Sequence, residues 1–533
     1  MLGLTMVPAA PASGAERDLS RFYHQQPGWA TCRPDPATDP PGSKIPWEKM
    51  DCATITVPLD YRHPGAGRLN VAISRLKAKD PNARRGVLLL NPGGPGGDGL
   101  DLPLAFANNA IAGSYDLIGF DPRGVGRSTR LRCDYPRSFL LHTRPTDEEF
   151  ADVSAHAQLL ELGCKRAGGG IRPFISTANT ARDLDVVRGV LGEKKINYLG
   201  FSYGTYLGAV YGSLFPAHLD RSVLDSSMHP EWLYYEQFAQ QAVAWRQNVD
   251  AWVAWIAERD RTYHLGSTVA AVTTALDELG LKLAAKPTPI KNPPPGFPEF
   301  ALDRNFFDLL LGGVPRTRPL WDVFAKVVNQ LRAATGARLD ADTDAAVGQL
   351  AGQVIPPTYE GAFQAITCEA DWPRELNTYY DRMRVFREKY PYGLGAIAVQ
   401  PTECTFRSFT PPEPLVPLRR HGYPIGVVVQ AEYDANTQYD GGPAMAARLG
   451  DNLISVADEG THGLYSRNEC VTRQIDAYFV HGVLPDSRAF CPGRPRPDVP
   501  PDKAGARPAP ASPLRAEVSR IIAENGPDHF RWR

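Results

Sequence analysis

The sequence predicts an α/β fold, in which a mostly parallel central sheet flanked by helices is interrupted by a helical insertion. Residues 28–224 alternate short apolar runs with helical patterns, and this alternation is typical of parallel strands connected by helices. From about 230 to 412 strand patterns are absent, and apolar residues recur at helical spacing. Strand patterns return at 424–485, so a mainly helical cap is expected between core strands.

The expected strands are apolar or β-branched runs that end in polar or glycine-rich loops. They cover residues 53–59, 69–76, 86–90, 115–120, 196–199, 221–224, 424–430 and 452–457. Helices are expected in the cap at 232–258, 303–312, 316–335 and 358–368, with a Pro-rich break at 287–298. We interpret the aromatic stripe of the first of these helices as packing rather than ligand contact.

These patterns divide the chain into successive segments. Residues 1–27 form a leader or signal-like remnant, 28–229 the first part of the core, 230–412 the cap, 413–490 the second part of the core, and 491–533 a Pro-rich tail with a short helix at 514–524. The first residues resemble the end of a secretory signal with small residues at a cleavage site. They lack a basic n-region and a full apolar h-region.

Length and composition indicate a large globular protein. The chain has 533 residues, 43% of them hydrophobic, and its net charge of −1 comes from 58 basic and 59 acidic residues. No basic stripe is present for a nucleic acid, and no apolar run reaches the roughly 18–20 residues that a membrane span needs. We therefore expect the partner to be a peptide or small-molecule substrate, not a nucleic acid or a membrane. The oligomeric state is left open, with a monomer favoured.

The most informative motif is GFSYG at 200–204, between an apolar run and a helical pattern. This is the G-x-S-x-G nucleophile elbow in its required context of strand, turn and helix. The nucleophile stands on a very tight turn, so the positions two before and two after Ser202 can hardly carry side chains. The turn exposes the Ser202 hydroxyl, and the amide of Tyr203 points back at any oxyanion that forms.

Two later strand ends supply partners in the chain order that this motif requires, Ser, then an acid, then His. Asp434 follows the run at 424–430, and His462 lies in the loop after 452–457. His462 would take the Ser202 proton and return it to the leaving group, while Asp434 would orient the imidazole. Each residue alone has an ordinary loop role as its alternative, and Glu432 is the nearest competitor for the acid.

A glycine-rich loop, NPGGPGGDG at 91–99, directly follows the apolar run at 86–90. Backbone without side chains can approach a substrate carbonyl, and its amides are then free to donate. A phosphate-binding loop is the rival interpretation, but no Lys-Ser/Thr pair follows and the G-x-G-x-x-G spacing is absent. The polar turn DPRGVGRS at 121–128 is expected to brace the loops beneath the site.

The segments PGGPGG, DPRGVGRS, GFSYGTYLG and THG, with the strand-end Asp434, resemble the α/β-hydrolase family of proline iminopeptidases and secreted actinobacterial tripeptidyl aminopeptidases. The segments CATITVPLDYRHP, DAWVAWIAERDRTYHLGST and AITCEADWP resemble the tripeptidyl aminopeptidase branch, and the similarity runs from about residue 28 to about 493.

This resemblance implies a catalytic triad of Ser202, Asp434 and His462, with oxyanion amides from Gly94 and Tyr203. Two departures concern the substrate more than the class. Pro92 stands where many relatives have His, and the sequence DANTQ at 434–438 replaces the more common D-P-x-T-P. No metal-ligand cluster or cofactor motif is found, so we expect no cofactor.

The eight cysteines include no C-x-x-C pair, which disfavours a zinc site. An even number spread along the chain suits disulfides in an oxidising compartment. Together with the resemblance this favours a secreted protein, whereas free thiols would indicate a cytoplasmic one. We hypothesise sequential pairing, Cys32–Cys52, Cys133–Cys164, Cys368–Cys404 and Cys470–Cys491.

Three functions remain open. The first is a serine exopeptidase that releases short N-terminal peptides or residues, with cap carboxylates pairing with the substrate ammonium. Glu369, Asp371 and Glu403 are the candidates for that role, with surface or structural roles as the alternative. The second is an esterase or lactonase that acts on a small metabolite with the same triad. The third is a non-catalytic binding protein on this scaffold, which the intact triad candidates disfavour.

Overall fold

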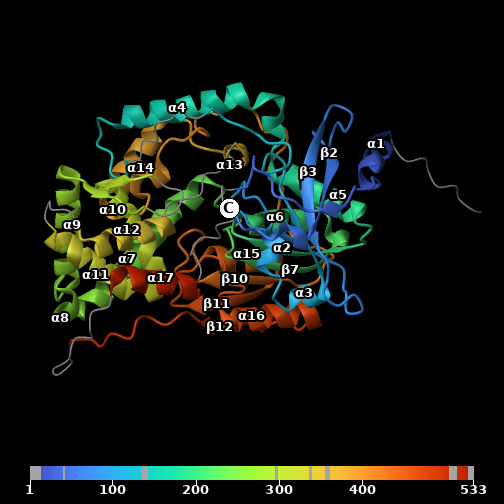
Figure 1. Cartoon of the computed structure of the whole chain (residues 1–533). Helices are drawn as coiled ribbons and strands as arrows, with labels where there is room; N and C mark the ends of the chain where they lie inside the picture. Colours follow the sequence, from blue (N-terminus) through green and yellow to red (C-terminus); the bar gives the residue numbers. More distant parts are fainter. Residues whose placement is uncertain are drawn as a thin grey trace, which may run out of the picture.

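A ten-stranded, mostly parallel sheet forms the centre of the core (Figure 1). The computed structural model describes residues 14–39, 43–134, 142–293, 298–334, 339–354, 361–502 and 513–525. The strand order is β1-β2-β3-β5-β4-β6-β7-β10-β11-β12. The strands span Ala30–Thr31 (β1), Asp51–Pro58 (β2), Arg68–Leu76 (β3), Val87–Asn91 (β4), Asp116–Phe120 (β5), Ile196–Phe201 (β6), Leu219–Asp225 (β7), Val427–Ala431 (β10), Asn452–Ala457 (β11) and Arg488–Pro492 (β12).

Strand direction places the candidate site. β5, β4, β6, β7, β10, β11 and β12 run parallel, whereas β1, β2 and β3 pair antiparallel and β3 joins β5 antiparallel. The carboxyl ends of the parallel strands therefore meet at one edge of the sheet, where ligands bind in open α/β sheets. The loops after β4, β6, β7, β10 and β11 all start at this edge.

Both faces of the sheet are covered, which explains the continuous apolar runs. In β4, Val87 and Leu89 pack in the core on one face, and Leu88 and Leu90 pack in the core on the other. The first core includes residues of α5 and α6, and the second includes residues of α2, α3 and α16. The core helices are Gly14–Tyr23 (α1), Leu102–Ala105 (α2), Ile111–Ser114 (α3), Thr177–Val190 (α5), Tyr203–Leu214 (α6), Gly441–Leu449 (α15) and Glu469–Asp476 (α16).

The helices between β7 and β10 form the cap, on the left of Figure 1. Trp252 stacks on Phe324 at 4.8 Å between ring centroids, and Trp255 meets Trp321 edge to face at 5.7 Å. The aromatic stripe of α7 is thus buried packing, as expected. The cap helices are Tyr235–Ala257 (α7), Asp260–Tyr263 (α8), Val269–Ala285 (α9), Arg304–Gly313 (α10), Trp321–Ala333 (α11), Ala341–Val354 (α12), Ala362–Thr367 (α13) and Leu376–Lys389 (α14).

Several boundaries differ from expectation. The cap contains a short antiparallel pair, β8 (Thr288–Ile290) with β9 (Phe300–Leu302), although no strand was expected there. Strands of three residues beside prolines are too short to give a recognisable pattern in the sequence. The helix α4 (Phe150–Ala167) belongs to the segment expected to form the core, 28–229. Its Ser154 nevertheless makes a hydrogen bond of 2.7 Å with the hydroxyl of Tyr380 on the cap helix α14. β12 crosses the expected start of the tail at residue 491.

The first and the last described segments of the chain, α1 and α17, both contact the body of the molecule. The expected leader at 1–27 includes α1, where Phe22 is buried and the Tyr23 hydroxyl donates to Asp185 at 2.9 Å; residues 1–13 lie outside the described part. The tail helix α17 (Leu514–Asn525) packs on the cap through Leu514, Val518 and Ile521 (Figure 1). The tail residues 503–512 and 526–533 also lie outside the described part.

The four sequential disulfides are confirmed: Cys32–Cys52, Cys133–Cys164, Cys368–Cys404 and Cys470–Cys491. Among the described helices, none is long and apolar enough to cross a membrane.

Candidate active site

Ser202 occupies a strained turn between β6 and α6. Its backbone has φ 56° and ψ −127°, a conformation that non-glycine residues rarely adopt and that marks functional turns. A Cβ on Gly200 would lie 2.4 Å from the Gly204 carbonyl oxygen, and one on Gly204 would lie 2.6 Å from Oδ1 of Asn91. The elbow therefore requires glycine at both positions.

Hydrogen bonds hold this turn in place. The Ser202 amide donates to the carbonyl of Asp225 at 3.1 Å, and the Thr205 hydroxyl donates to the Ser202 carbonyl at 2.6 Å. Tyr203 opens α6, so its amide has no acceptor within the helix and is available to an anion.

The glycine-rich loop after β4 lies directly against the elbow. Gly93, Gly94 and Gly96 have φ of 96°, 111° and 93°, a region that favours glycine. A Cβ on Gly93 would lie 2.4 Å from the Phe201 carbonyl oxygen and 2.9 Å from Cβ of Ser202. The absence of a side chain at Gly93 is what allows the two loops to touch, and Gly94 is the next residue of this loop.

Asp434 and His462 lie together although they follow different strands. Oδ2 of Asp434 is 2.8 Å from Nδ1 of His462, and both side chains are buried. The amides of Asn436 and Thr437 donate to Oδ1 of Asp434 at 2.8 and 3.1 Å, and the Thr437 hydroxyl donates to Oδ2 at 2.9 Å. These donors fix the carboxylate, which in turn fixes the imidazole.

The loop that carries His462 depends on two further acids that the sequence analysis missed. Glu459 accepts the amides of Gly460 and Thr461 at 2.9 Å each. Asp225, the last residue of β7, accepts the amides of Leu464 and Tyr465. The only sequence signal for Asp225 is an acidic residue at the end of an apolar strand.

These two acids differ electrostatically. Burial raises the pKa of Asp225 to about 6, although the amides of Tyr465 and Leu464 oppose that shift. Burial acts in the same direction on Glu459, but the Arg494 guanidinium, 3.2 Å away, holds the pKa of Glu459 below its usual range.

Glu369 is the cap acid whose hydrogen bonds lead, through Thr177, to the residue after Ser202. It is partly buried and accepts the Thr177 amide at 2.8 Å, the Thr177 hydroxyl at 2.5 Å and the Tyr234 hydroxyl at 3.2 Å. The Thr177 hydroxyl also lies 2.9 Å from the hydroxyl of Tyr203, the residue after Ser202. Burial raises the pKa of Glu369 to about 7.

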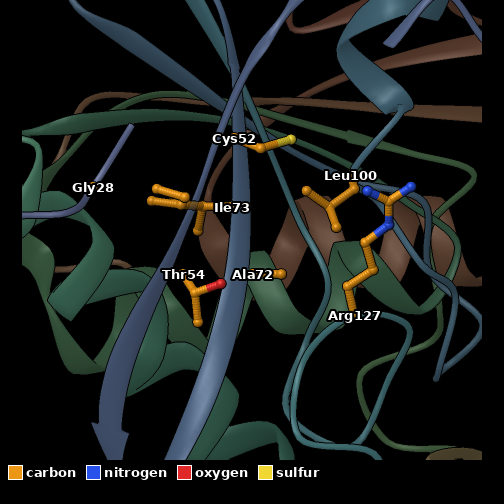
Figure 2. A pocket seen from close by; sticks show the side chains of 8 residues that line it. Gly28, Cys52, Thr54, Ala72, Ile73, Leu100 and Arg127 are labelled. Atoms are coloured by element: carbon orange, nitrogen blue, oxygen red, sulfur yellow. The ribbon is translucent and has the colours of Figure 1, made fainter. Parts of the chain in front are cut away.

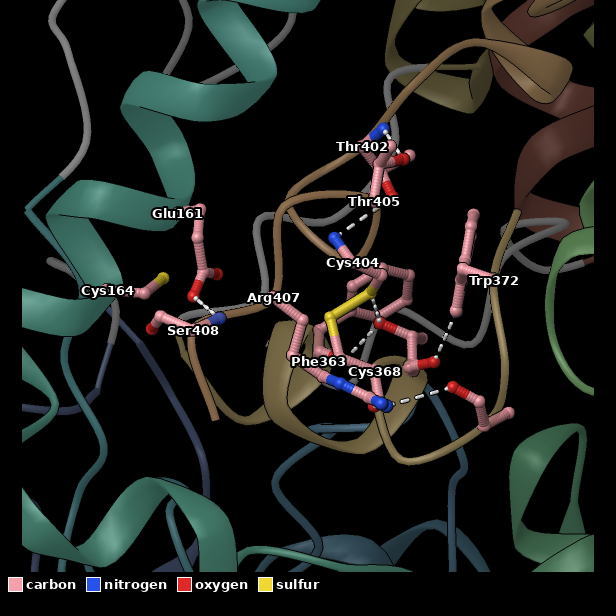
Figure 3. Close-up of a disulfide and its surroundings, with 12 residues drawn as sticks. Glu161, Cys164, Phe363, Cys368, Trp372, Thr402, Cys404, Thr405, Arg407 and Ser408 are labelled. Carbon is pink, nitrogen blue, oxygen red and sulfur yellow. Dashed lines mark hydrogen bonds between the residues drawn. A yellow bond between two sulfur atoms is a disulfide. The ribbon is translucent and has the colours of Figure 1, made fainter. Parts of the chain in front are cut away.

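The other two cap acids have different surroundings. Asp371 is exposed, whereas Glu403 is buried, and burial raises the pKa of Glu403. The Cys368–Cys404 disulfide joins the residue before Glu369 to the residue after Glu403 (Figure 3). Glu369 and Glu403 therefore belong to one cross-linked part of the cap.

A hollow of about 440 Å³ lies elsewhere, on β2 and β3, with Cys52, Leu100 and Arg127 in its lining (Figure 2). None of the predicted site residues lines it. Within the described ranges, no group of three or more His, Cys, Asp or Glu residues could hold a metal ion.

The chain matches known proteins over most of its length. The α/β hydrolase fold family matches residues 86–308, and the family of TAP-like proteins matches residues 390–491. The tripeptidyl aminopeptidase of Streptomyces lividans is 35% identical over 450 residues, which cover 81% of this chain and 82% of that protein.

Two mycobacterial proteins are more distant. Serine protease Hip1 of Mycobacterium tuberculosis is 25% identical over 526 residues, 92% of this chain and 95% of that protein. Carboxylesterase B of M. tuberculosis is 28% identical over 534 residues, 92% and 96% of the two chains. With the parallel sheet and the serine elbow, these matches show that the chain is a serine hydrolase and belongs to the α/β-hydrolase family, in the branch that contains the tripeptidyl aminopeptidases of Streptomyces.

Proposed function

We propose that the protein is an aminopeptidase that releases short peptides or residues from the free N-terminus of a substrate through an acyl-enzyme on Ser202. The observation that carries this proposal is the set of strand-end residues at one edge of the sheet: Ser202 on its strained turn after β6, and the Asp434–His462 pair, 2.8 Å apart, after β10 and β11. The name of the Streptomyces relative supports the aminopeptidase assignment.

In the proposed acylation step, Oγ of Ser202 attacks the scissile carbonyl carbon while His462 accepts the Ser202 proton. The amides of Gly94 and Tyr203 stabilise the negative oxygen that develops. His462 then gives its proton to the leaving amine, the C–N bond breaks, and the N-terminal part of the substrate remains as an ester on Ser202. Water hydrolyses this ester with His462 again as the base, while Asp434 orients the imidazole.

Glu369 is proposed as the acceptor of the substrate ammonium. Its carboxylate accepts hydrogen bonds from Thr177 and Tyr234. When ionised, a carboxylate can accept about four hydrogen bonds, so it can also accept one from an ammonium group. Because burial raises the pKa of Glu369 to about 7, a bound ammonium would stabilise the ionised form. Glu403 is the second candidate because it is buried, and the exposed Asp371 is the third.

An esterase acting on a small metabolite is the alternative, supported by the similarity to carboxylesterase B. A panel of chromogenic amides with one, two or three residues, each with a free or acetylated amine, separates the two functions when simple aryl esters are run beside it. An aminopeptidase hydrolyses the free-amine amides far faster than the acetylated ones. Equal turnover of both forms, together with fast ester hydrolysis, would establish the esterase instead.

Export from the cell is proposed on the four disulfides, since such bonds persist in oxidising compartments. Thiol titration of the protein isolated from culture medium should find no free thiol. Recovery of the protein only from the cytoplasm, with free thiols, would contradict export. A monomer is proposed for the solution state, which light scattering on the purified protein tests.

A further inference from the structure

Three consecutive backbone amides follow His462, and all three are held by the end of β7. The Gly463 amide donates to Oγ of Ser226 at 2.7 Å. The Leu464 amide lies 3.1 and 2.9 Å from the two carboxylate oxygens of Asp225, and the Tyr465 amide donates to Oδ2 at 2.7 Å. The Ser226 hydroxyl also donates to Oδ1 of Asp225 at 3.2 Å.

The same residue reaches the nucleophile. The Asp225 carbonyl accepts the Ser202 amide at 3.1 Å, and Asp225 pairs with Phe201 across β6 and β7. β7 lies between the strand of Ser202 and the strand of Asp434. Asp225 is thus bonded through its main chain to the nucleophile turn and through its side chain to the His462 loop.

The charge of Asp225 has no cationic partner of its own. The side chain is 0% exposed, and no Lys or Arg of the described part forms an ion pair with it. In contrast, Glu459, on the loop that carries His462, is paired with Arg494. Amides and a hydroxyl do not neutralise a carboxylate as a cation would. The negative charge of ionised Asp225 therefore interacts strongly with other nearby charges, because the buried surroundings screen it little.

We propose that Asp225 is a positioning residue for catalysis, whose carboxylate anchors the His462 loop and electrostatically stabilises the protonated imidazole alongside Asp434. The proposal rests on the proposed function, in which His462 carries a proton during each half-reaction.

Asp434 supplies the first negative charge to the ring, at Nδ1, and the other charged groups around His462 add none that is uncompensated. On the loop itself, Glu459 is neutralised by Arg494, and the Arg467 guanidinium donates to the His462 carbonyl at 3.3 Å. Besides Asp434, the described residues around His462 therefore add one buried carboxylate without a Lys or Arg partner, Asp225 at the end of β7. In agreement with this, burial raises the pKa of Asp225, and the positive charge of a protonated His462 acts in the opposite direction and lowers it.

Asp225→Asn removes the charge but can keep the geometry. Its amide oxygen can still accept the Leu464 and Tyr465 amides, while its NH₂ group can donate to Ser226. Ser226→Ala keeps the charge and removes the hydroxyl that holds Gly463. Asp476→Asn is the matched control, because Asp476 accepts the hydroxyl of Tyr465 at 2.7 Å on the same loop without reaching its backbone.

Two readouts distinguish the roles. The first is the rate at which a fluorophosphonate labels Ser202 as a function of pH, and the second is the titration of His462 followed by low-field proton NMR. In Asp225→Asn both midpoints should move to lower pH by at least about half a unit, because the imidazolium loses a nearby anion. Labelling at the pH optimum should fall roughly 10–100-fold.

Ser226→Ala should label about tenfold more slowly with an unshifted midpoint, and Asp476→Asn should match the wild type. An Asp225→Asn protein with wild-type midpoints and a labelling rate within twofold would overturn the proposal. If that variant does not fold, a wild-type rate in Ser226→Ala would overturn it. Failure of the wild type to label at Ser202 would overturn the proposed function instead, and the NMR titration would still decide the role of Asp225.

Discussion

Replacing Glu369 by Gln tests whether the cap binds the free amine of the substrate through this side chain. The change keeps the size of the side chain and removes its charge. A hydrogen bond to a charged group contributes about 1.5–3 kcal/mol, and Glu369 is partly buried, so solvent screens it only in part. The loss of the ammonium contact should lower kcat/KM about 10–150-fold for free-amine substrates.

The assay is hydrolysis of one chromogenic peptide amide with its amine free or acetylated, over pH 5–9 as a rough working range. Burial raises the pKa of Glu369 to about 7, so acidification protonates it and weakens ammonium binding. The free-amine substrate should therefore gain kcat/KM as pH rises through about 7, and Glu369→Gln should remove that component. For the acetylated substrate, kcat/KM in both proteins should show only the pH dependence that comes from His462 acting as the base.

Asp371→Asn compares the neighbouring candidate, because Asp371 lies two residues away and is exposed. If Glu369 accepts the ammonium, Asp371→Asn should change neither substrate by more than about twofold, and a loss confined to the free-amine substrate in that variant would move the ammonium site to Asp371. An equal loss on free and acetylated substrates in Glu369→Gln would refute the reasoning, since it would reduce Glu369 to support of the Thr177 and Tyr234 contacts. A loss confined to Glu403→Gln would move the ammonium site to that residue.

Three further outcomes are expected. Ser202→Ala should lose about 10⁶-fold in kcat with an unchanged circular dichroism spectrum, and activity within tenfold of the parent would remove Ser202 as nucleophile. Thr437→Val deletes the 2.9 Å hydroxyl bond to Asp434, so kcat should fall about tenfold with little change in KM; unchanged kcat would show that the two amide donors suffice. Replacing Cys470 and Cys491 by Ala opens a loop of 21 residues' separation, which should lower the free energy of unfolding by roughly 3 kcal/mol in denaturant titrations, and a wild-type value would contradict that contribution.

Much of the core could be predicted because its signals are local. The expected strand at 452–457 has the bounds of β11, and the run at 424–430 becomes β10 at Val427–Ala431. Continuous apolar runs follow from a sheet buried on both faces. The tail helix at 514–524 is also close to α17, but its apolar face revealed nothing of its docking on the cap.

The parts that escaped prediction depend on contacts between distant segments. The contacts of Asp225 cannot be predicted locally, because the His462 loop that it binds lies more than 200 residues later in the chain. Nothing in the sequence distinguishes Thr437 from an ordinary loop residue, because its role depends on the hydrogen bond of its hydroxyl to Asp434. The three cap acids are all candidates from the sequence, which does not show the burial and hydrogen-bond partners that separate them: Glu369 accepts three hydrogen bonds and Asp371 is exposed.

The acyl-enzyme itself offers the most direct test of the central claim. A peptide amide with a free N-terminus is mixed with the enzyme and quenched in acid within the first turnovers, and intact-protein and peptide mass spectrometry locate any adduct. The account predicts an ester on Ser202 whose added mass equals the N-terminal fragment of the substrate, so the mass also counts the residues released. An adduct on another residue, or product formation with no adduct on Ser202 under conditions that slow deacylation, would contradict the account.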